Sequence, residues 1–273
     1  MKTKKIKAIS ANTMAIIVSL IMFIPIYLVV INSLKDQVQA SSMGVDLPTA
    51  LHWGNFLTVI EKGKLGQAFL NSMIYSTFAT IIAITLSAMA AFVLSRNRTR
   101  ANRYIYYLIV MGIALPMNFV TLTKVMQLTH LINTQIGIII LYAATQIPLS
   151  VFIIYAFVET IPRELDEAAI IDGCGPFRLF FSIILPLLKP ALVTTAILSF
   201  LWIWSEFLLP LYYLNKSTYW PMTLAIYNFF GQYESDWSLV SADILLTILP
   251  VVVVYLLGQR FIVSGMTSGA VKG

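Results

Sequence analysis

Six long apolar stretches dominate this sequence and restrict the folds open to it. Each is apolar for about 20 residues or more, which is the length an α-helix needs, at 1.5 Å per residue, to cross about 30 Å of hydrocarbon. Charged residues make up only 11% of the 273 residues, against roughly 25% in soluble domains. The sequence therefore predicts an all-α polytopic membrane protein with six transmembrane helices, since no long β-type alternation is present. We place these helices at 13–34, 68–94, 104–126, 136–158, 190–213 and 239–259.

The positive charges fall mostly on one side of the predicted membrane. Of the 18 Lys and Arg residues, those on one side are Lys2, Lys4, Lys5, Lys7, Arg96, Arg98, Arg100, Arg103, Arg163, Arg178, Lys189, Arg260 and Lys272. Those on the other side are Lys35, Lys62, Lys64, Lys124 and Lys216. Because basic residues concentrate in cytoplasmic connections, both termini are predicted to face the cytoplasm. Anionic lipid accounts for the net charge of +6, which requires no nucleic acid.

The organisation expected from this topology is simple. Residues 1–12 form a cytoplasmic tail, 13–260 the transmembrane domain with a cytoplasmic loop at about 159–190, and 261–273 a second cytoplasmic tail. A cleaved signal peptide ending near Ala40 is the rival reading of the N-terminus, but the apolar run is longer than the 7–15 residues of such a peptide. The single cysteine, Cys174, excludes an intrachain disulfide.

Small residues mark one face of the second predicted span, and prolines interrupt five of the six. The small residues recur every three or four positions, so another helix could approach them closely, either in this chain or in another subunit. They are Ser72, Ser76, Ala79, Ala83, Ser87 and Ala90. The prolines remove backbone donors and are expected to kink their helices. They are Pro25, Pro116, Pro148, Pro210 and Pro250.

The predicted cytoplasmic loop carries five acids within fourteen residues, namely Glu159, Glu164, Asp166, Glu167 and Asp172. Pro162 suits the first turn of a helix, and acids are favoured in that turn. Gly173 can adopt the left-handed conformation that ends a helix, and Pro176 suits the start of the next one. The sequence thus predicts a short helix of about eleven residues outside the bilayer, with exposed acids and small alanines. Such a helix favours docking on another protein over a merely solvated loop.

The same residues resemble a known family. Glu167-Ala168-Ala169, followed by Gly173 and then by Ile183-x-Leu185-Pro186, resembles the EAA loop of ATP-binding cassette (ABC) importer permeases. The stretches NSMIYSTFATIIAITLSAMAAFVLSR (71–96) and GMTSGAVKG (265–273) are similar to the carbohydrate branch of that family. The likeness runs from about Phe69 to the end of the chain, and it implies the type I permease fold.

The resemblance implies a transport subunit of the bacterial inner membrane, with ATP and Mg bound by a partner ATPase and no cofactor in this chain. The implied partners are a second permease, expected to be non-identical, two ATPase subunits, an extracellular sugar-binding protein, membrane lipid and a carbohydrate substrate. The residues implied in coupling to the ATPase are Glu167, Ala168, Ala169, Asp172, Gly173, Leu185 and Pro186. The C-terminal residues implied to contact the ATPase are Gly265, Gly269 and Lys272.

The substrate pathway is less defined by the sequence. Polar or aromatic groups inside the predicted spans suit sugar rings, although they also serve as hydrogen-bonding contacts between helices. They are Asn118, Gln146, Trp204, Glu206 and Tyr212. Ser205 replaces the asparagine that family members often carry before the acid, which puts any role of that amide in doubt. For Glu206 itself, a gate or an interhelical hydrogen bond on the one hand, and simple exposure at the outer interface on the other, both remain open.

Other functions are disfavoured by what the sequence lacks. No G-x-x-x-x-G-K-[ST] motif for nucleotide binding occurs, and neither H-E-x-x-H nor G-x-S-x-G is present, so the chain is not expected to be an enzyme. The two histidines, His52 and His130, fall in external segments. An ion-coupled carrier would be expected to hold ionisable groups at the membrane midplane, where this chain has few. An ABC permease for a non-sugar solute stays the main alternative.

Overall fold

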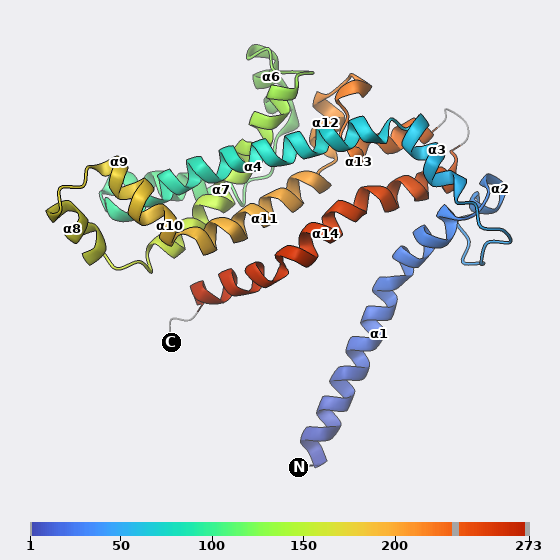
Figure 1. Cartoon of the computed structure of the whole chain (residues 1–273), viewed down its shortest axis with the longest axis horizontal. Helices are drawn as coiled ribbons and strands as arrows, with labels where there is room; N and C mark the ends of the chain where they lie inside the picture. Colours follow the sequence, from blue (N-terminus) through green and yellow to red (C-terminus); the bar gives the residue numbers. More distant parts are fainter. Residues whose placement is uncertain (1, 231–234, 271–273) are drawn as a thin grey trace. The chain divides into compact units, whose positions relative to one another are not determined.

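A computed structural model of the chain describes residues 2–230 and 235–270, with side chains described for 12–230 and 235–261. The long helices are α1 (Lys2–Ser33), α4 (Leu65–Arg96), α7 (Gln135–Val158), α11 (Lys189–Ser205) and α14 (Trp237–Ala270) (Figure 1). The short α-helices are α2 (Gln37–Ala40), α3 (Gly54–Lys62), α5 (Arg100–Met111), α6 (Phe119–Leu128), α8 (Glu164–Ile171), α9 (Pro176–Arg178), α10 (Leu185–Leu187), α12 (Leu208–Tyr213) and α13 (Met222–Ala225). A π-helix, η1 (Leu179–Ile184), and two 3₁₀-helices, η2 (Ser217–Tyr219) and η3 (Ile226–Phe229), complete the set.

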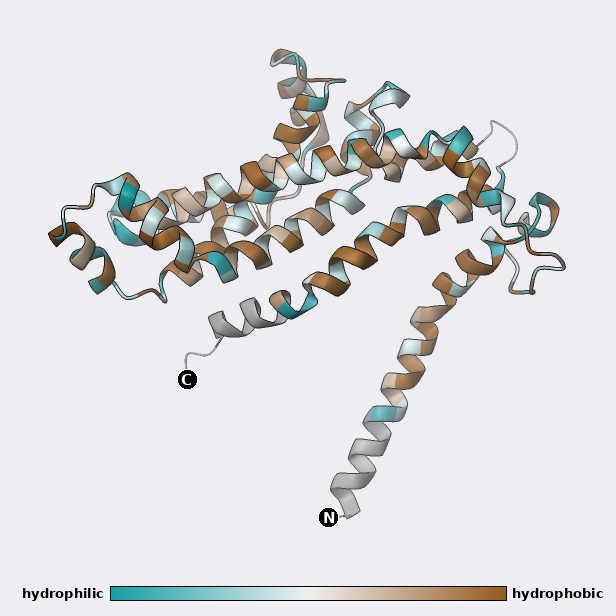
Figure 2. Ribbon diagram, in the orientation of Figure 1, coloured by the Kyte–Doolittle hydropathy of each residue, from teal (hydrophilic) through white to brown (hydrophobic). Residues whose placement is uncertain are grey.

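The all-α prediction is confirmed. Within the described ranges the extended pairing is limited to one isolated antiparallel bridge, between Phe230 and Ser235. The long helices are coloured mainly as apolar along their described lengths, whereas the connections between them mix polar and apolar residues (Figure 2). This distribution is the one expected of helices that cross hydrocarbon.

Among the described residues, four helices are long and apolar enough to cross a membrane by themselves, against the six predicted. They are Asn12–Ser33, Leu65–Arg96, Gln135–Val158 and Trp237–Phe261. A fifth candidate is a bent pair, Pro176–Leu187 followed by Lys189–Ser205, with a bend of 74° between the two parts. The fifth predicted span, 190–213, is also divided, because the chain leaves helical geometry at Glu206, where φ is −72° and ψ is 132°.

The third predicted span, 104–126, is not one continuous helix. Helix α5 ends at Met111, and α6 begins only at Phe119 with Asn118 as its N-cap. Pro116, which lacks a backbone donor, lies in the non-helical segment between them. Gly112 starts this segment in close contact with α7, because a Cβ atom there would lie 3.0 Å from Cγ of Pro148. The break therefore combines local chain chemistry with packing against a neighbouring helix.

By its internal contacts the chain divides into two compact units. The first unit consists of Met1–Gln67 and Ala225–Leu249, and the second consists of Ala68–Leu224 and Pro250–Gly273. In the first unit, Lys35 is buried at the end of α1, with Nζ 3.0 Å from Oδ1 of Asn32 and 2.8 Å from the carbonyl oxygen of Gly44. Asn55 donates to the carbonyl oxygens of Ser33 and Lys35. These bonds fix the loop that follows α1 to the end of the helix.

One acid of the last predicted span also belongs to the first unit. Asp243 lies in α14 and is 1% exposed. Its Oδ1 atom has no hydrogen-bond partner among the described residues. The last predicted span therefore contains a buried acid, and burying an acid without a partner costs free energy.

The second unit is organised around α7, which packs against α5, α11 and α12 (Figure 1). One buried cluster joins α4 to the N-terminal part of α7 through Tyr75, Ala79 and Ile138, and another joins the C-terminal end of α4 to the loop after α7. The small-residue face of α4 is buried in the chain, apart from the half-buried Ala90. Of the two readings open from the sequence, the structure therefore supports packing within this chain.

The segment between α12 and α13 is held on the first turns of α4. Asn71 donates to the carbonyl oxygens of Thr218 and Trp220 at 2.9 and 3.0 Å, and the hydroxyl of Tyr75 donates to the carbonyl oxygen of Tyr219 at 2.8 Å. Oγ of Ser72 accepts from the backbone N–H of Met222. Side chains thereby satisfy backbone groups that no regular element pairs.

Candidate functional site

Helix α8 begins where acids crowd its first turn. Glu164, Asp166 and Glu167 all lie there, where the helix dipole favours negative charge. The helix has eight residues rather than the eleven predicted, because Arg163 is its N-cap and Pro162 lies one residue further out. Pro162 is therefore before the helix and not in its first turn.

The end of α8 confirms the role predicted for Gly173 in the backbone. Its φ is +77°, and its N–H donates to the carbonyl oxygen of Ile170 at 3.0 Å. The N–H of Cys174 donates to the carbonyl oxygen of Ala169 at 2.9 Å. These two bonds form a Schellman motif, which requires a left-handed residue and so favours glycine. Asp172 is the C-cap and is exposed.

Polar contacts attach the start of this loop to the C-terminal end of α4. Nε of Arg96 lies 2.6 Å from Oδ2 of Asp166, and both side chains are only 13% exposed. Arg96 also donates to the carbonyl oxygen of Ile161, while Arg163 donates to that of Ser95, each at 3.1 Å. These contacts join α8 and the loop before it directly to the end of α4.

A second ion pair lies beside the first and is more exposed. Glu159 accepts from the hydroxyl of Ser95 and from the guanidinium of Arg98. The Arg98 side chain is 57% exposed. Solvent screening makes such a pair weak, so Arg96 and Asp166 are the stronger attachment.

One side of α8 packs on the chain and the other is open. Ala169 is buried in a cluster with Phe180 and Ile184, so it faces its own bundle and cannot give the close seating on another protein expected of it. Glu167 and Ala168 are exposed. Large apolar side chains are exposed around them, namely Leu165 (42%), Ile170 (61%), Ile171 (85%) and Phe177 (75%). An exposed apolar patch next to acids is typical of a surface that binds protein.

The helical segment after α8 contains a change of helix type. Pro176 is at the first position of α9, as predicted, and the chain then passes through the π-helix η1 into α10. Leu185 is half-buried and Pro186 exposed in α10. The 74° bend into α11 follows at the fully buried Leu188. π-Helical turns are rare and often mark functional segments.

The C-terminal residues implied in ATPase contact are described only in part. Gly265 and Gly269 lie in the helical backbone of α14, for which side chains are not described beyond Phe261. Lys272 lies outside the described residues. Helix α14 thus continues to Ala270 through most of the stretch predicted as a tail.

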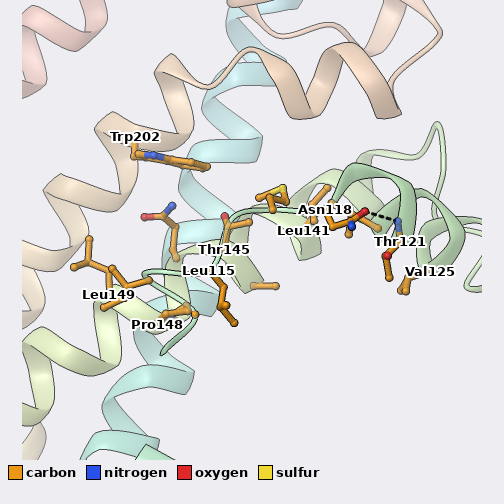
Figure 3. A pocket seen from close by; sticks show the side chains of 15 residues that line it. Leu115, Asn118, Thr121, Val125, Leu141, Thr145, Pro148, Leu149 and Trp202 are labelled. Atoms are coloured by element: carbon orange, nitrogen blue, oxygen red, sulfur yellow. Dashed lines mark hydrogen bonds between the residues drawn. The ribbon is translucent and has the colours of Figure 1, made fainter. Parts of the chain in front are cut away.

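A cavity of about 700 Å³ opens where the third predicted span is broken. Its walls come from the segment 112–118, from α6, from α7 and from α11. The lining residues are Gly112, Ile113, Leu115, Met117, Asn118, Thr121, Leu122, Val125, Leu141, Ala144, Thr145, Gln146, Pro148, Leu149 and Trp202. In Figure 3 the Trp202 ring lies across one end of the cavity, and Thr145 projects from α7 toward it.

Two of the five predicted pathway residues line this cavity. Asn118 does so while its Oδ1 atom accepts from the N–H of Thr121 at 3.1 Å and caps α6 (Figure 3). Gln146, on α7, is 5% exposed and lines the cavity as well. Their amides are the polar groups that a hydrogen-bonding solute would meet.

The other three predicted pathway residues lie outside the cavity lining. Trp204 is buried against Phe69 and Phe200, with ring centroids 5.8 Å from each. Tyr212 is 57% exposed, and its ring lies tilted against that of Phe119, with centroids 4.9 Å apart. Trp202, Thr121 and Thr145 line the cavity, although the sequence did not predict them as pathway residues.

Glu206 has a structural role at the break between α11 and α12. Its carboxylate accepts from the N–H groups of Leu208 and Leu209, at 3.0 and 2.8 Å, and so caps α12. Its carbonyl oxygen accepts from the hydroxyl of Thr223. The carboxylate thus has a local capping role that neither sequence reading proposed, and both readings stay predictions.

The sequence profile of one family covers more than half of this chain. Residues 83–268, which include the loop and the cavity, match the family described as "Binding-protein-dependent transport system inner membrane component". The chain belongs to this family. It is therefore an ABC importer permease, a multi-pass membrane subunit that serves transport and is not an enzyme.

Individual permeases resemble the chain along most of its length. The "Probable starch degradation products transport system permease protein AmyC" of Thermoanaerobacterium thermosulfurigenes is 35% identical over 261 residues, which cover 95% of either chain. The "Melibiose/raffinose/stachyose import permease protein MelC" of Bacillus subtilis strain 168 is 34% identical over 275 residues, which cover 100% of this chain and 99% of MelC.

A solved structure shares the permease fold. It is a crystal structure of a bacterial ABC transporter involved in the import of the acidic polysaccharide alginate, and one of its chains superposes with a TM-score of 0.83. The match covers 95% of this permease and 98% of that chain, at 19% identity. At this identity the likeness establishes the fold alone.

Proposed function

We propose that this permease carries carbohydrate into a bacterial cell, driven by ATP hydrolysis in a partner ATPase. The observation that carries the choice of cargo is the likeness to AmyC and MelC, whose names assign them starch degradation products and melibiose, raffinose and stachyose. The chain covers at least 95% of both relatives, so the comparison extends to every segment that a permease needs.

In this proposal α8 is the helix that couples the permease to the ATPase. The exposed side of α8 supplies the contact, with Glu167 placed to pair with a basic group of the ATPase and Ala168 leaving room for close approach. The bond from Arg96 to Asp166 then passes the movement to α4, and the helical segment from Pro176 passes it to α11. Closure of the ATPase would thereby tilt two spans and change the side on which the cargo path is open.

The assembly proposed around this chain has a second, non-identical permease, two ATPase subunits that bind ATP and Mg, and an extracellular sugar-binding protein. The distribution of Lys and Arg supports an orientation with both termini and α8 in the cytoplasm. In that orientation the C-terminal end of α14, with Gly265 and Gly269, emerges on the side of the ATPase, and Lys272 follows it in the sequence.

The 700 Å³ cavity is the proposed part of the cargo path within this chain. Trp202, 43% exposed, offers a flat ring on which a sugar can stack. Gln146, Thr145 and Asn118 offer amide and hydroxyl groups for sugar hydroxyls. Apolar walls with a few polar groups are usual for sites that bind small molecules.

The coupling proposal is tested by reversing the charge of one exposed acid. Glu167→Lys is expected to lower sugar uptake at least tenfold while the chain still inserts in the membrane and the complex still hydrolyses ATP. Glu164→Lys is the matched control, since Glu164 is also an exposed acid in the first turn of α8. Normal uptake with Glu167→Lys, or equal losses in both variants, would rule out a specific contact at Glu167. Radiolabelled melibiose and a non-sugar solute supplied in parallel separate the cargo classes.

A further inference from the structure

A second pocket, of about 360 Å³, lies at the ends of α4, α5 and α7, away from the cavity just described. Its lining residues are Leu94, Arg98, Thr99, Arg103, Tyr106, Tyr107, Tyr155 and Glu159. All of them belong to the second unit of the chain. Neither α8 nor the lining of the larger cavity contributes to it.

Positive charge exceeds negative charge in this pocket. The one acid, Glu159, is already engaged by Arg98 and by Ser95. Arg103 has no carboxylate within 4.0 Å in the part of the chain that the structure describes. Arg103 therefore leaves a guanidinium with its hydrogen-bond donors directed to solvent or to a ligand, and the ligand it favours is an anion.

The remaining polar groups are also suited to an anion. Tyr106 stacks on Tyr155, with ring centroids 4.1 Å apart, so both rings are held in place. Tyr107 is 59% exposed beside them. Phenolic hydroxyls donate hydrogen bonds, and an arginine with tyrosine hydroxyls is a donor set that fits the oxygens of a phosphate group.

The surface next to the pocket is apolar. On α5 the exposed aliphatic side chains are Ile105 (46%), Leu108 (66%) and Met111 (49%), and the exposed Tyr104 (74%) precedes them in the helix. Tyrosines at one end of an apolar helical face are typical of the boundary between headgroups and acyl chains. A ligand in the pocket thus has apolar surface beside it on which hydrocarbon chains can lie.

We propose that the pocket formed by Arg98, Arg103, Tyr106, Tyr107 and Tyr155 binds the phosphate of an anionic phospholipid headgroup. In the orientation of the proposed function, on which this inference rests for the choice of leaflet, the site faces the cytoplasmic leaflet. Basic pockets between helix ends on this side are suited to anionic lipids. A lipid there would lie beside Arg98 and Glu159, which are each two residues away from Arg96 and Ile161 in the attachment of the α8 loop to α4.

The test is lipid binding to the membrane complex that co-purifies with the tagged chain. Native mass spectrometry in detergent is used to titrate phosphatidylglycerol, phosphatidylcholine and inorganic phosphate. We expect phosphatidylglycerol to bind in preference to phosphatidylcholine, and Arg103→Gln to weaken its binding about fivefold, since one basic residue near such a lipid contributes about that factor. Tyr107→Phe, which removes only a hydroxyl, is expected to weaken it by a smaller factor.

Arg100→Gln is the matched control, because Arg100 is exposed on the same helix but does not line the pocket. It is expected to change binding by less than twofold. Equal losses from Arg100→Gln and Arg103→Gln, or equal binding of the two lipids, would overturn the proposal. Inorganic phosphate that displaces the lipid completely would assign the pocket to free phosphate. The lipid-binding measurement needs neither ATP nor sugar. The lipid proposal can therefore be wrong while the coupling proposal is right, and the coupling proposal can be wrong while the lipid proposal is right.

Discussion

Trp202 and Trp204 lie two residues apart on α11 and have different environments. At 3.6 residues per turn their side chains point about 200° apart, so Trp202 reaches the cavity while Trp204 is 2% exposed in the core. Helix α11 is apolar on all sides, so its sequence pattern did not tell which tryptophan faces the cavity. Only the packing of α7 against α11 decides it.

Replacing each tryptophan by alanine is expected to separate transport from stability. Trp202→Ala should lower sugar uptake at least tenfold and leave the thermal unfolding temperature of the purified complex nearly unchanged, because an exposed ring is removed. Trp204→Ala should cost about 3–5 kcal/mol of stability through the cavity it leaves. Uptake assays and thermal unfolding on the same preparations check both. Full uptake by Trp202→Ala would remove this residue from the cargo path.

A comparison of substitutions at Gly173 and Gly175 separates the effect of backbone strain from the effect of steric crowding. A Cβ atom at either position would meet no atom within 4 Å, but only Gly173 has a positive φ, +77° against −71°. Gly173→Ala is therefore expected to destabilise the loop by about 1–2 kcal/mol through the left-handed conformation alone. Gly175→Ala should be nearly neutral. Limited proteolysis of the loop measures the difference, and equal protease sensitivity would contradict the requirement for a left-handed residue.

At the scale of elements, the sequence predicted those features that depend on residues close together in the chain. The acids at the start of α8, its end at Gly173 and the new helix at Pro176 all followed from residue preferences that depend on near neighbours. The third span did not follow, because a stretch rich in apolar residues reads as one helix even where Gly112 must contact Pro148 on another element. The inward orientation of Ala169 was missed for the same reason, since it depends on the distant Phe180.

The attachment of α8 to α4 leads to a prediction about two ion pairs. Arg96→Gln is expected to cost about 3 kcal/mol, because it leaves the largely buried Asp166 carboxylate without its cation. Arg98→Gln should cost less than about 1 kcal/mol, because that arginine is 57% exposed. Thermal unfolding gives the stabilities, and ATPase and uptake rates show whether Arg96→Gln also uncouples them. Similar losses from the two variants would mean that burial does not distinguish the pairs.

At the scale of the whole molecule, the orientation in the membrane decides whether α8 can reach an ATPase at all. The sequence supports one orientation through the distribution of Lys and Arg, whereas helix geometry alone is compatible with either. Cys174, half-buried at the end of α8, is the single cysteine of the chain. Labelling of Cys174 therefore reports on which side of the membrane the α8 loop lies.

Labelling of Cys174 with a membrane-impermeant maleimide is expected in inside-out vesicles and not in intact cells. Cys174→Ser combined with Lys216→Cys is the matched control, because Lys216 is exposed in the connection predicted to be external, and its labelling should be reversed. Vesicles that also contain the ATPase subunits should label more slowly at Cys174, since the ATPase would cover α8. Labelling of Cys174 from outside would exclude cytoplasmic coupling through α8. Equal labelling rates with and without the ATPase would instead leave the orientation intact and place the contact elsewhere on the cytoplasmic face.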